Sequence, residues 1–280
     1  MKFTAEKSDD NLKVGFFLSK RNVSRRLVTK LKRCENGITL NGSPCRTIDT
    51  VHEGDLVEIT MQDGGGLEPN PELSVKIAFE NESLAVFDKP SSMPVHPSIK
   101  HQGDTLGNYF ASLFPDLTFR PVNRLDRDTS GLCIVAKNPF SAKALQFSVK
   151  KTYFAAVCGQ TEKSGTIDLP IAREKDSIIK RIVSENGQKA VTHFEKIAEN
   201  SRFSLLKINL ETGRTHQIRV HFSHIGHPLV GDTLYGSPSE LISRQALHCG
   251  ELTLPDPVSG ELITVKSDLP DDMKRLFEHE

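Results

Sequence analysis

The sequence predicts an α+β fold in two parts: a larger part built on a mostly antiparallel mixed sheet, preceded by a small unit of helix and β-hairpin. Three observations predict it. Apolar segments have the length and alternation of strands, short helical segments are interspersed irregularly among them, and Gly64 to Gly66 interrupt the chain ahead of two prolines. We therefore place the small unit at residues 1–62, a Gly/Pro-rich linker at 63–72 and the larger domain at 73–280.

Composition narrows the classes of protein that are possible. With 280 residues, 37% hydrophobic and 26% charged, the chain can bury a sizeable core, which excludes disorder of the whole. No segment approaches the ~18 uninterrupted apolar residues that span a bilayer, and the first residues turn polar, so we expect a cytoplasmic protein with no membrane partner. Five scattered cysteines without a C-x-x-C pair argue against a disulfide framework and a thiolate zinc site.

Charge is neutral in total and uneven along the chain. There are 36 Lys and Arg against 36 Asp and Glu. The segment from Leu12 to Arg46 holds nine basic residues and one acid, Glu35, so it carries nine minus one, or +8, and the rest carries −8. A positive segment of this kind is the local footprint of a nucleic-acid surface.

The positive segment contains a predicted amphipathic helix that Ser24 can cap. Its apolar positions, which are expected to face inward, are Leu27, Val28 and Leu31. Three basic residues then form a row on another side at the spacing i, i+4, i+7, namely Arg26, Lys30 and Arg33. The helix therefore offers a basic stripe to a partner.

Two short strands follow this helix. Residues 38–42 form a strand ending in an Asn-Gly turn, and residues 54–59 form a turn feeding an alternating strand. In this order the pieces resemble the small RNA-binding domain named after ribosomal protein S-four, also called the alpha-L domain. The resemblance implies RNA contacts from Arg25, Arg26, Lys30 and Arg33. A solvated cationic helix on an unrelated module is the alternative.

The larger domain mixes strands and helices. Strands are expected at Leu84–Phe87, Leu132–Ala136, Lys151–Val157, Val191–Ile197 and Phe203–Leu210. Helices are expected at Leu106–Leu113, Ser141–Lys150 and Thr215–His224. Such a mixture carries its site on loops and helix ends.

A turn ahead of the strand at Leu132 concentrates charge. Two carboxylates, Asp126 and Asp128, alternate with Arg124 and Arg127. Because an adjacent arginine lowers the pKa of a carboxyl group, such an acid stays ionised and can serve as a nucleophile or a base. A surface loop with local hydrogen bonds is the alternative, and spacing alone favours it.

A second cluster follows the strand that ends at Leu210. Thr212 or Thr215 can cap the next helix, and Arg214 and Arg219 can pair with a distant carboxylate or a phosphate. The histidines of this stretch do not have the i, i+4 spacing of helical zinc ligands, so no metal site is expected.

A third feature is a tyrosine in a strand. Tyr153 is one of three tyrosines, and its ring can either pack in the core or form a face on which a flipped base stacks.

These stretches, in this order, resemble the RluA-type pseudouridine synthase family from about Leu84 to about Leu254. Residues 123–132, Asn-Arg-Leu-Asp-Arg-Asp-Thr-Ser-Gly-Leu, are similar to the family signature His-Arg-Leu-Asp-x-x-Thr-Ser-Gly-Leu. Four further blocks are family-like, at 88–97, 151–153, 213–221 and 227–236. The resemblance implies conversion of uridine to pseudouridine within RNA, without a cofactor or a metal.

The resemblance also implies roles for single residues. Asp126 would be the catalytic carboxylate, which either attacks the sugar or removes a sugar proton. Arg219 would keep it ionised, with Arg214 as the less favoured substitute. Tyr153 would stack on the flipped uracil, and Arg124 would fill the space that the base leaves.

One position departs from the signature, and several properties stay open. Asn123 stands where many members carry His, which predicts an effect on loop support or RNA contact. Ribosomal RNA of the large subunit is the favoured substrate, with transfer RNA possible, and a monomer is assumed. Two other interpretations differ in class. An RNA-binding docking protein would keep its affinity without Asp126, and a metal-dependent nuclease using Asp126 and Asp128 would be inhibited by a chelator.

Overall fold

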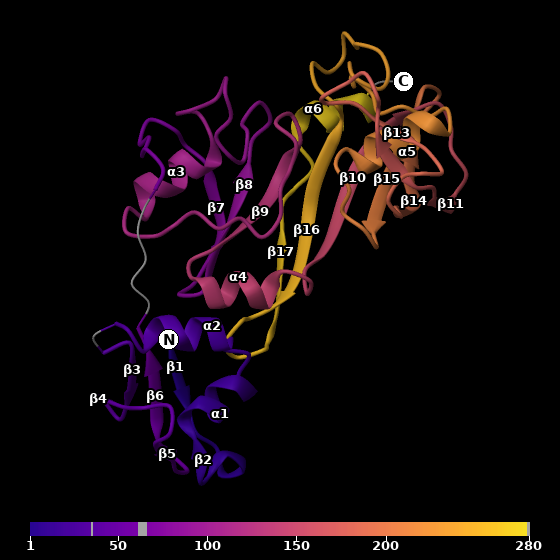
Figure 1. Cartoon of the computed structure of the whole chain (residues 1–280). Helices are drawn as coiled ribbons and strands as arrows, with labels where there is room; N and C mark the ends of the chain where they lie inside the picture. The colour runs from indigo at the N-terminus through magenta and orange to yellow at the C-terminus, as the bar shows by residue number, and fades with distance from the viewer. Residues whose placement is uncertain (35, 61–65, 279–280) are drawn as a thin grey trace.

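The computed structural model describes residues 1–34, 36–60 and 66–278, and these form two parts (Figure 1). The first part, up to residue 60, has a four-stranded sheet and its own apolar core. The second part is built on a nine-stranded sheet. Residues 63–65 of the expected linker lie outside the described residues.

The N-terminal unit folds around a small antiparallel sheet in the order β1, β6, β3, β4. Its strands are β1 (Lys2–Thr4), β2 (Leu12–Lys13), β3 (Ile38–Leu40), β4 (Ser43–Pro44), β5 (Thr50–Val51) and β6 (Leu56–Ile59). Its helical elements are η1 (Lys7–Asp9), α1 (Val14–Lys20) and α2 (Arg25–Leu31). Asn41 and Gly42 both have positive φ in the turn from β3 to β4, which confirms the predicted Asn-Gly hairpin.

Helix α2 begins as predicted. The Ser24 hydroxyl accepts a hydrogen bond from the backbone N–H of Leu27 at 3.2 Å. Leu31 is buried, and Leu27 and Val28 are half-buried against the same apolar cluster. Their burial leaves the basic side of the helix in solvent.

The large sheet is mixed and mostly antiparallel, which confirms the predicted fold class. Its path is β11-β14-β15-β10-β16-β9-β8-β7, with β17 also paired to β16. Among the described strands of this sheet, β16 and β9 form its parallel pair. The strands are β7 (Lys76–Glu80), β8 (Leu84–Lys89), β9 (Ser130–Ala136), β10 (Lys150–Cys158), β11 (Ser164–Asp168), β14 (Val191–Glu199), β15 (Phe203–Leu210), β16 (Leu247–Pro255) and β17 (Leu262–Lys266). A separate hairpin joins β12 (Ile171–Arg173) to β13 (Arg181–Val183).

Helices cover the two halves of this sheet (Figure 1). They are α3 (Leu106–Leu113), α4 (Pro139–Leu145), α5 (Gln217–His224) and α6 (Asp271–Lys274), followed by η2 (Arg275–Phe277). Helix α3 packs on β8 through Phe110 and Phe87, whose ring centroids are 6.3 Å apart. Helix α5 packs on β14 through Phe222 and Phe194, at 5.4 Å.

Two helix predictions need correction. The helix expected over Ser141–Lys150 ends at Leu145, because the chain turns at 146–148 and Lys150 already pairs with β16. The helix expected from Thr215 begins at Gln217, and neither Thr212 nor Thr215 is its N-cap. In both places tertiary pairing overrides a pattern that is locally helical.

The N-terminal unit contacts the larger domain through α4. Phe140 of that helix is buried within the N-terminal apolar cluster, and its ring lies 5.9 Å from that of Phe3 in an edge-on arrangement. Figure 1 shows α4 next to α2. The apolar core of the small unit is thus completed by a residue of the larger domain.

Gly131 allows β9 to approach β16 closely. Its φ is +108°, and a Cβ at this position would lie 2.3 Å from the carbonyl oxygen of Cys249. Gly131 pairs with Cys249 in the parallel ladder. A side chain there would push the two central strands apart.

We predict that Gly131→Ala lowers the free energy of unfolding by about 2–4 kcal/mol, because it adds both backbone strain and a clash. Urea denaturation of the full chain measures this. Gly103→Ala is the matched control, since a methyl group added at Gly103 would meet no atom within 4 Å. Equal stability of the two variants would contradict the packing argument.

Candidate active site

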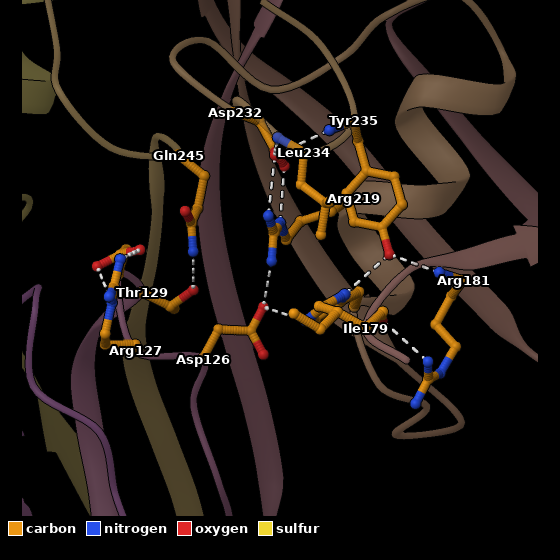
Figure 2. A network of polar contacts seen from close by, with 12 residues as sticks. Asp126, Arg127, Thr129, Ile179, Arg181, Arg219, Asp232, Leu234, Tyr235 and Gln245 are labelled. Carbon is orange, nitrogen blue, oxygen red and sulfur yellow. Dashed lines mark hydrogen bonds and ion pairs between the residues drawn. The ribbon is translucent and has the colours of Figure 1, made fainter. Parts of the chain in front are cut away.

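Asp126 lies in the loop that precedes β9, which we call the catalytic loop (residues 124–129), and it faces α5 (Figure 2). Its side chain is 28% exposed, so solvent and a substrate can reach it. Oδ2 accepts a hydrogen bond from Nη1 of Arg219 at 2.9 Å. Oδ1 accepts no hydrogen bond from the part of the chain that the structure describes.

Arg219 bridges two carboxylates. Besides Asp126, it binds Asp232 with both arms of its fork, from Nε to Oδ2 at 2.7 Å and from Nη2 to Oδ1 at 2.9 Å. The Asp232 side chain is fully buried. Burial by itself lowers the pKa of Arg219, but its hydrogen bonds and charge attraction to both carboxylates outweigh burial and raise that pKa. Arg219 is therefore a permanent cation, and its Nη1 lies 2.9 Å from Oδ2 of Asp126.

Helix α5 is anchored to β14 at its first residue. Gln217 is buried, and its Nε2 donates to the carbonyl of Val191 and to the hydroxyl of Thr192, both at 3.0 Å. Its Oε1 accepts from the Thr212 hydroxyl at 2.8 Å and from the backbone N–H of Arg214 at 3.0 Å. These bonds fix where the helix starts, and hence where Arg219 lies.

His216 and Tyr235 stand beside the same pair of charges. The Nε2 atom of His216 lies 3.7 Å from Oδ2 of Asp126, and its Nδ1 lies 2.8 Å from the Tyr235 hydroxyl. The Arg219 guanidinium carbon lies 5.0 Å from the centroid of the Tyr235 ring. Burial lowers the pKa of His216. The positive charges of Arg219 and Arg181 lower it further, whereas the negative charge of Asp126 raises it.

Asn123, the residue ahead of the catalytic loop, is tied to strand β9. It is buried, its Nδ2 donates to the carbonyl of Leu132 at 3.1 Å, and its Oδ1 accepts from the backbone N–H of Ile134 at 2.8 Å. Of the two effects expected for this residue, its contacts are those of loop support. An amide can make both bonds, one as donor and one as acceptor, to strand β9.

Lys89 ties the other side of this loop to the end of β8. It is fully buried, and its ammonium donates to the carbonyls of Pro90 at 2.6 Å, Met93 at 2.8 Å and Arg127 at 3.0 Å. Burial lowers the pKa of Lys89 to about 8, so it stays mostly protonated at neutral pH. Three N–H donors thus meet three backbone acceptors.

The surface beside Asp126 is hollowed into an open pocket. It is lined by Arg124, Asp126, Tyr153, Arg214 and His216, among others. Tyr153 follows an irregularity in the pairing of β10 with β16, and such bulges re-aim side chains. Burial raises the pKa of its hydroxyl, which stays protonated.

The structure brings most of the expected site residues to this pocket. Arg214 lines it but donates from Nε to the carbonyl of Lys189 at 3.0 Å, so it does not replace Arg219 as the partner of Asp126. Asp128 instead forms a fork with Arg127, at 2.9 Å for both bonds. The remaining expected residues lie on or next to α2 in the N-terminal unit, namely Arg25, Arg26, Lys30 and Arg33.

Sequence reasoning missed four contributors to the site. Lys89, His216, Asp232 and Tyr235 belong to the family-like blocks at 88–97, 213–221 and 227–236, but the sequence predicted no role for them. Their contacts join segments far apart in the chain. Their position within those blocks was the sequence signal that could have identified them.

Two kinds of feature are absent from the described residues. No group of three or more His, Cys, Asp or Glu in these ranges is placed to hold a metal ion. No helix among them combines the length and the apolar character needed to cross a membrane.

Comparison with known proteins identifies the class. The family model described as RNA pseudouridylate synthase matches residues 83–224. The protein named "Uncharacterized RNA pseudouridine synthase YjbO" of Bacillus subtilis is 38% identical over 273 residues, covering 92% of this chain and 95% of that protein. Ribosomal large subunit pseudouridine synthase D of Pseudomonas aeruginosa is 37% identical over 259 residues, covering 84% and 81%.

A solved structure agrees with these relatives. Human RNA Pseudouridylate Synthase Domain Containing 1 superposes with a TM-score of 0.61 at 26% identity, covering 72% of this chain and 86% of that one. The fold and the matches together define an RNA-modifying isomerase. The chain belongs to the RNA pseudouridylate synthase family, which confirms the resemblance of the segment from about Leu84 to about Leu254 to pseudouridine synthases.

We predict that Arg219→Met lowers the free energy of unfolding by about 3–5 kcal/mol, because the buried Asp232 then loses its cation and keeps hydrogen bonds from the backbone N–H groups of Leu234 and Tyr235. Adding Asp232→Leu to this variant should recover part of the loss, since no uncompensated charge remains. Thermal and urea denaturation measure both. If the double variant is less stable than Arg219→Met, the burial of Asp232 is not what Arg219 offsets.

Proposed function

We propose that the chain isomerises chosen uridines of large-subunit ribosomal RNA, with Asp126 as the carboxylate that reacts at the ribose. The observation that carries this proposal is the asymmetry of its two oxygens. Oδ2 accepts a hydrogen bond from the buried cation of Arg219. Oδ1 accepts no hydrogen bond from the described residues. The side chain is 28% exposed and lies on the wall of an open pocket. An ionised oxygen held at a fixed place is what the reaction requires.

The reaction conserves all atoms. The bond from ribose carbon 1 to uracil N1 breaks, the uracil turns, and the same ribose carbon bonds to ring carbon 5. The hydrogen of carbon 5 leaves to solvent and N1 gains one. Asp126 acts at the ribose either as nucleophile or as the base that removes a sugar proton, and Arg219 holds its Oδ2 in place in both routes. No oxidant or reductant is needed.

The target base must leave its stack to reach Asp126. Tyr153 lies on the pocket wall, where its ring is suited to stack on the flipped uracil. Arg124 is exposed and two residues ahead of Asp126, so it is suited to occupy the space left in the RNA. Arg214 adds positive charge at the same rim for the phosphates.

The N-terminal unit, residues 1–62, is proposed as the part that recruits RNA. Helix α2 exposes Arg25, Arg26 and Lys30, and Arg33 follows it in the next turn, also exposed. This unit contains the whole segment from Leu12 to Arg46, which carries +8. The name of the Pseudomonas aeruginosa relative, which specifies the large ribosomal subunit, supports that RNA as the substrate.

We predict that Asp126→Asn abolishes pseudouridine formation, by at least about 10³-fold, and leaves RNA affinity within about twofold. The measurement is tritium release from RNA labelled at uracil carbon 5, with EDTA present. Asp128→Asn is the matched control, since its carboxylate only pairs with the neighbouring Arg127, and it should stay within a few-fold of the wild type.

Four outcomes would contradict this proposal in different ways. An active Asp126→Asn variant would remove the proposed carboxylate. Activity lost with EDTA alone would favour metal chemistry, and binding without release from any ribosomal or transfer RNA would favour a docking protein. Tritium release from transfer RNA alone would show that transfer RNA, and not large-subunit ribosomal RNA, is the substrate.

We predict that replacing Arg26, Lys30 and Arg33 by Ala weakens RNA binding and makes the negative slope of log affinity against log salt shallower by about 2–3, because three phosphate contacts are lost. Filter binding over a salt series measures this. The control replaces three exposed lysines of the larger domain, Lys163, Lys266 and Lys274. An equal loss in both variants would show that only total charge matters.

A further inference from the structure

A second chain of polar contacts reaches Asp126, apart from the Arg219 pair. It begins at the backbone N–H of Arg181 in β13, which donates to the Tyr235 hydroxyl at 2.9 Å. It continues from that hydroxyl to Nδ1 of His216 at 2.8 Å and ends with Nε2 of His216, 3.7 Å from Oδ2 of Asp126. Figure 2 shows the Tyr235 hydroxyl pointing to the side of the site where Asp126 lies.

The backbone of His216 is held in an unusual conformation. Its φ is 58° and its ψ is 18°, in the left-handed region, and it is the N-cap of α5 without capping the helix through its side chain. A residue other than glycine in this region carries strain of about 1 kcal/mol or more. Strain of this kind persists where surrounding structure enforces it, and here it sets the ring between Tyr235 and Asp126.

The hydrogen-bond directions along this chain favour one tautomer of the ring. The Tyr235 oxygen already accepts from Arg181, and His216 Nδ1 is the acceptor within reach of its own hydroxyl proton among the described residues. Since burial disfavours the charged ring, His216 is neutral, and a neutral ring that accepts at Nδ1 carries its proton on Nε2. The Nε2–H group then faces Asp126.

We propose that His216, oriented by Tyr235, is a positioning residue that directs its Nε2–H toward Oδ2 of Asp126. Together with Arg219 it occupies the Oδ2 side of the carboxylate and leaves Oδ1 as the oxygen that meets the ribose. This inference rests on the proposed role of Asp126. The separation of 3.7 Å is close enough for the bond to form when a substrate closes the site.

The first test reads the proton directly. Long-range ¹H–¹⁵N spectra of the full chain, labelled with ¹⁵N-histidine, are recorded over pH, with His216→Asn to assign the signal. We expect an unprotonated Nδ1 and a protonated Nε2 at neutral pH, and a mixture of tautomers in Tyr235→Phe. A proton on Nδ1, or a charged ring at neutral pH, would overturn the proposal. The charged groups that face this ring are Asp126, Arg181, Arg219 and Asp232.

The second test measures turnover. His216→Asn suits the left-handed backbone and keeps a polar atom near the Nδ1 position, but it removes the atom that faces Asp126. We expect kcat to fall about 10- to 100-fold with KM for RNA within about twofold, as for a misplaced reacting group. Unchanged kcat would overturn the proposal.

A matched control separates this role from loss of any histidine. His193 has the same arrangement on the sheet surface, with Nδ1 at 2.8 Å from the Thr166 hydroxyl and Nε2 at 2.8 Å from Glu211. His193→Asn should leave kcat unchanged, and a fall equal to that of His216→Asn would count against the proposal. An inactive wild type would refute the proposed function instead, while the spectra would still decide the tautomer.

Discussion

The site depends on one guanidinium shared by two carboxylates. Asp232 is fully buried, so it requires a paired cation, and the fork of Arg219 supplies two bonds. That pairing uses Nε and Nη2 and leaves Nη1 to reach Asp126. The buried pair thus fixes the orientation of Arg219, and Arg219 in turn fixes the position of the accessible carboxylate of Asp126.

The rest of the larger domain serves to bring the catalytic loop to this cation across 93 residues of sequence. The parallel pairing of β9 with β16 fixes where the loop ahead of β9 lies, and Gly131 allows the two strands to approach closely. Lys89 then binds the backbone of the loop at Arg127, and Asn123, the residue just ahead of the loop, binds the backbone of β9. A carboxylate on an exposed loop is ordinarily mobile, so these bonds are what convert a charged turn into a site with fixed geometry.

Sequence reasoning succeeded where a signal is local. Alternation placed Phe203–Leu210 at its observed bounds, and Ser24 was recognised as a cap, because both depend on neighbours along the chain. It failed where tertiary pairing decides, as when β10 ended the helix predicted to reach Lys150. The pairing of Asp126 with Arg219 came from the family resemblance, since spacing alone favoured a surface loop. The left-handed cap at His216 had no local signal at all.

The two parts of the chain use charge under different physical conditions. The basic residues of α2 are exposed, so salt screens them over about 10 Å, and they suit reversible capture of a polyanion. Arg219 and Asp232 are buried, where screening is weak. Added salt should therefore screen the charges of α2 while leaving the Arg219–Asp232 pair in place. A chain with no net charge can attract a polyanion in this way, because its positive segment is separate from its buried ion pair.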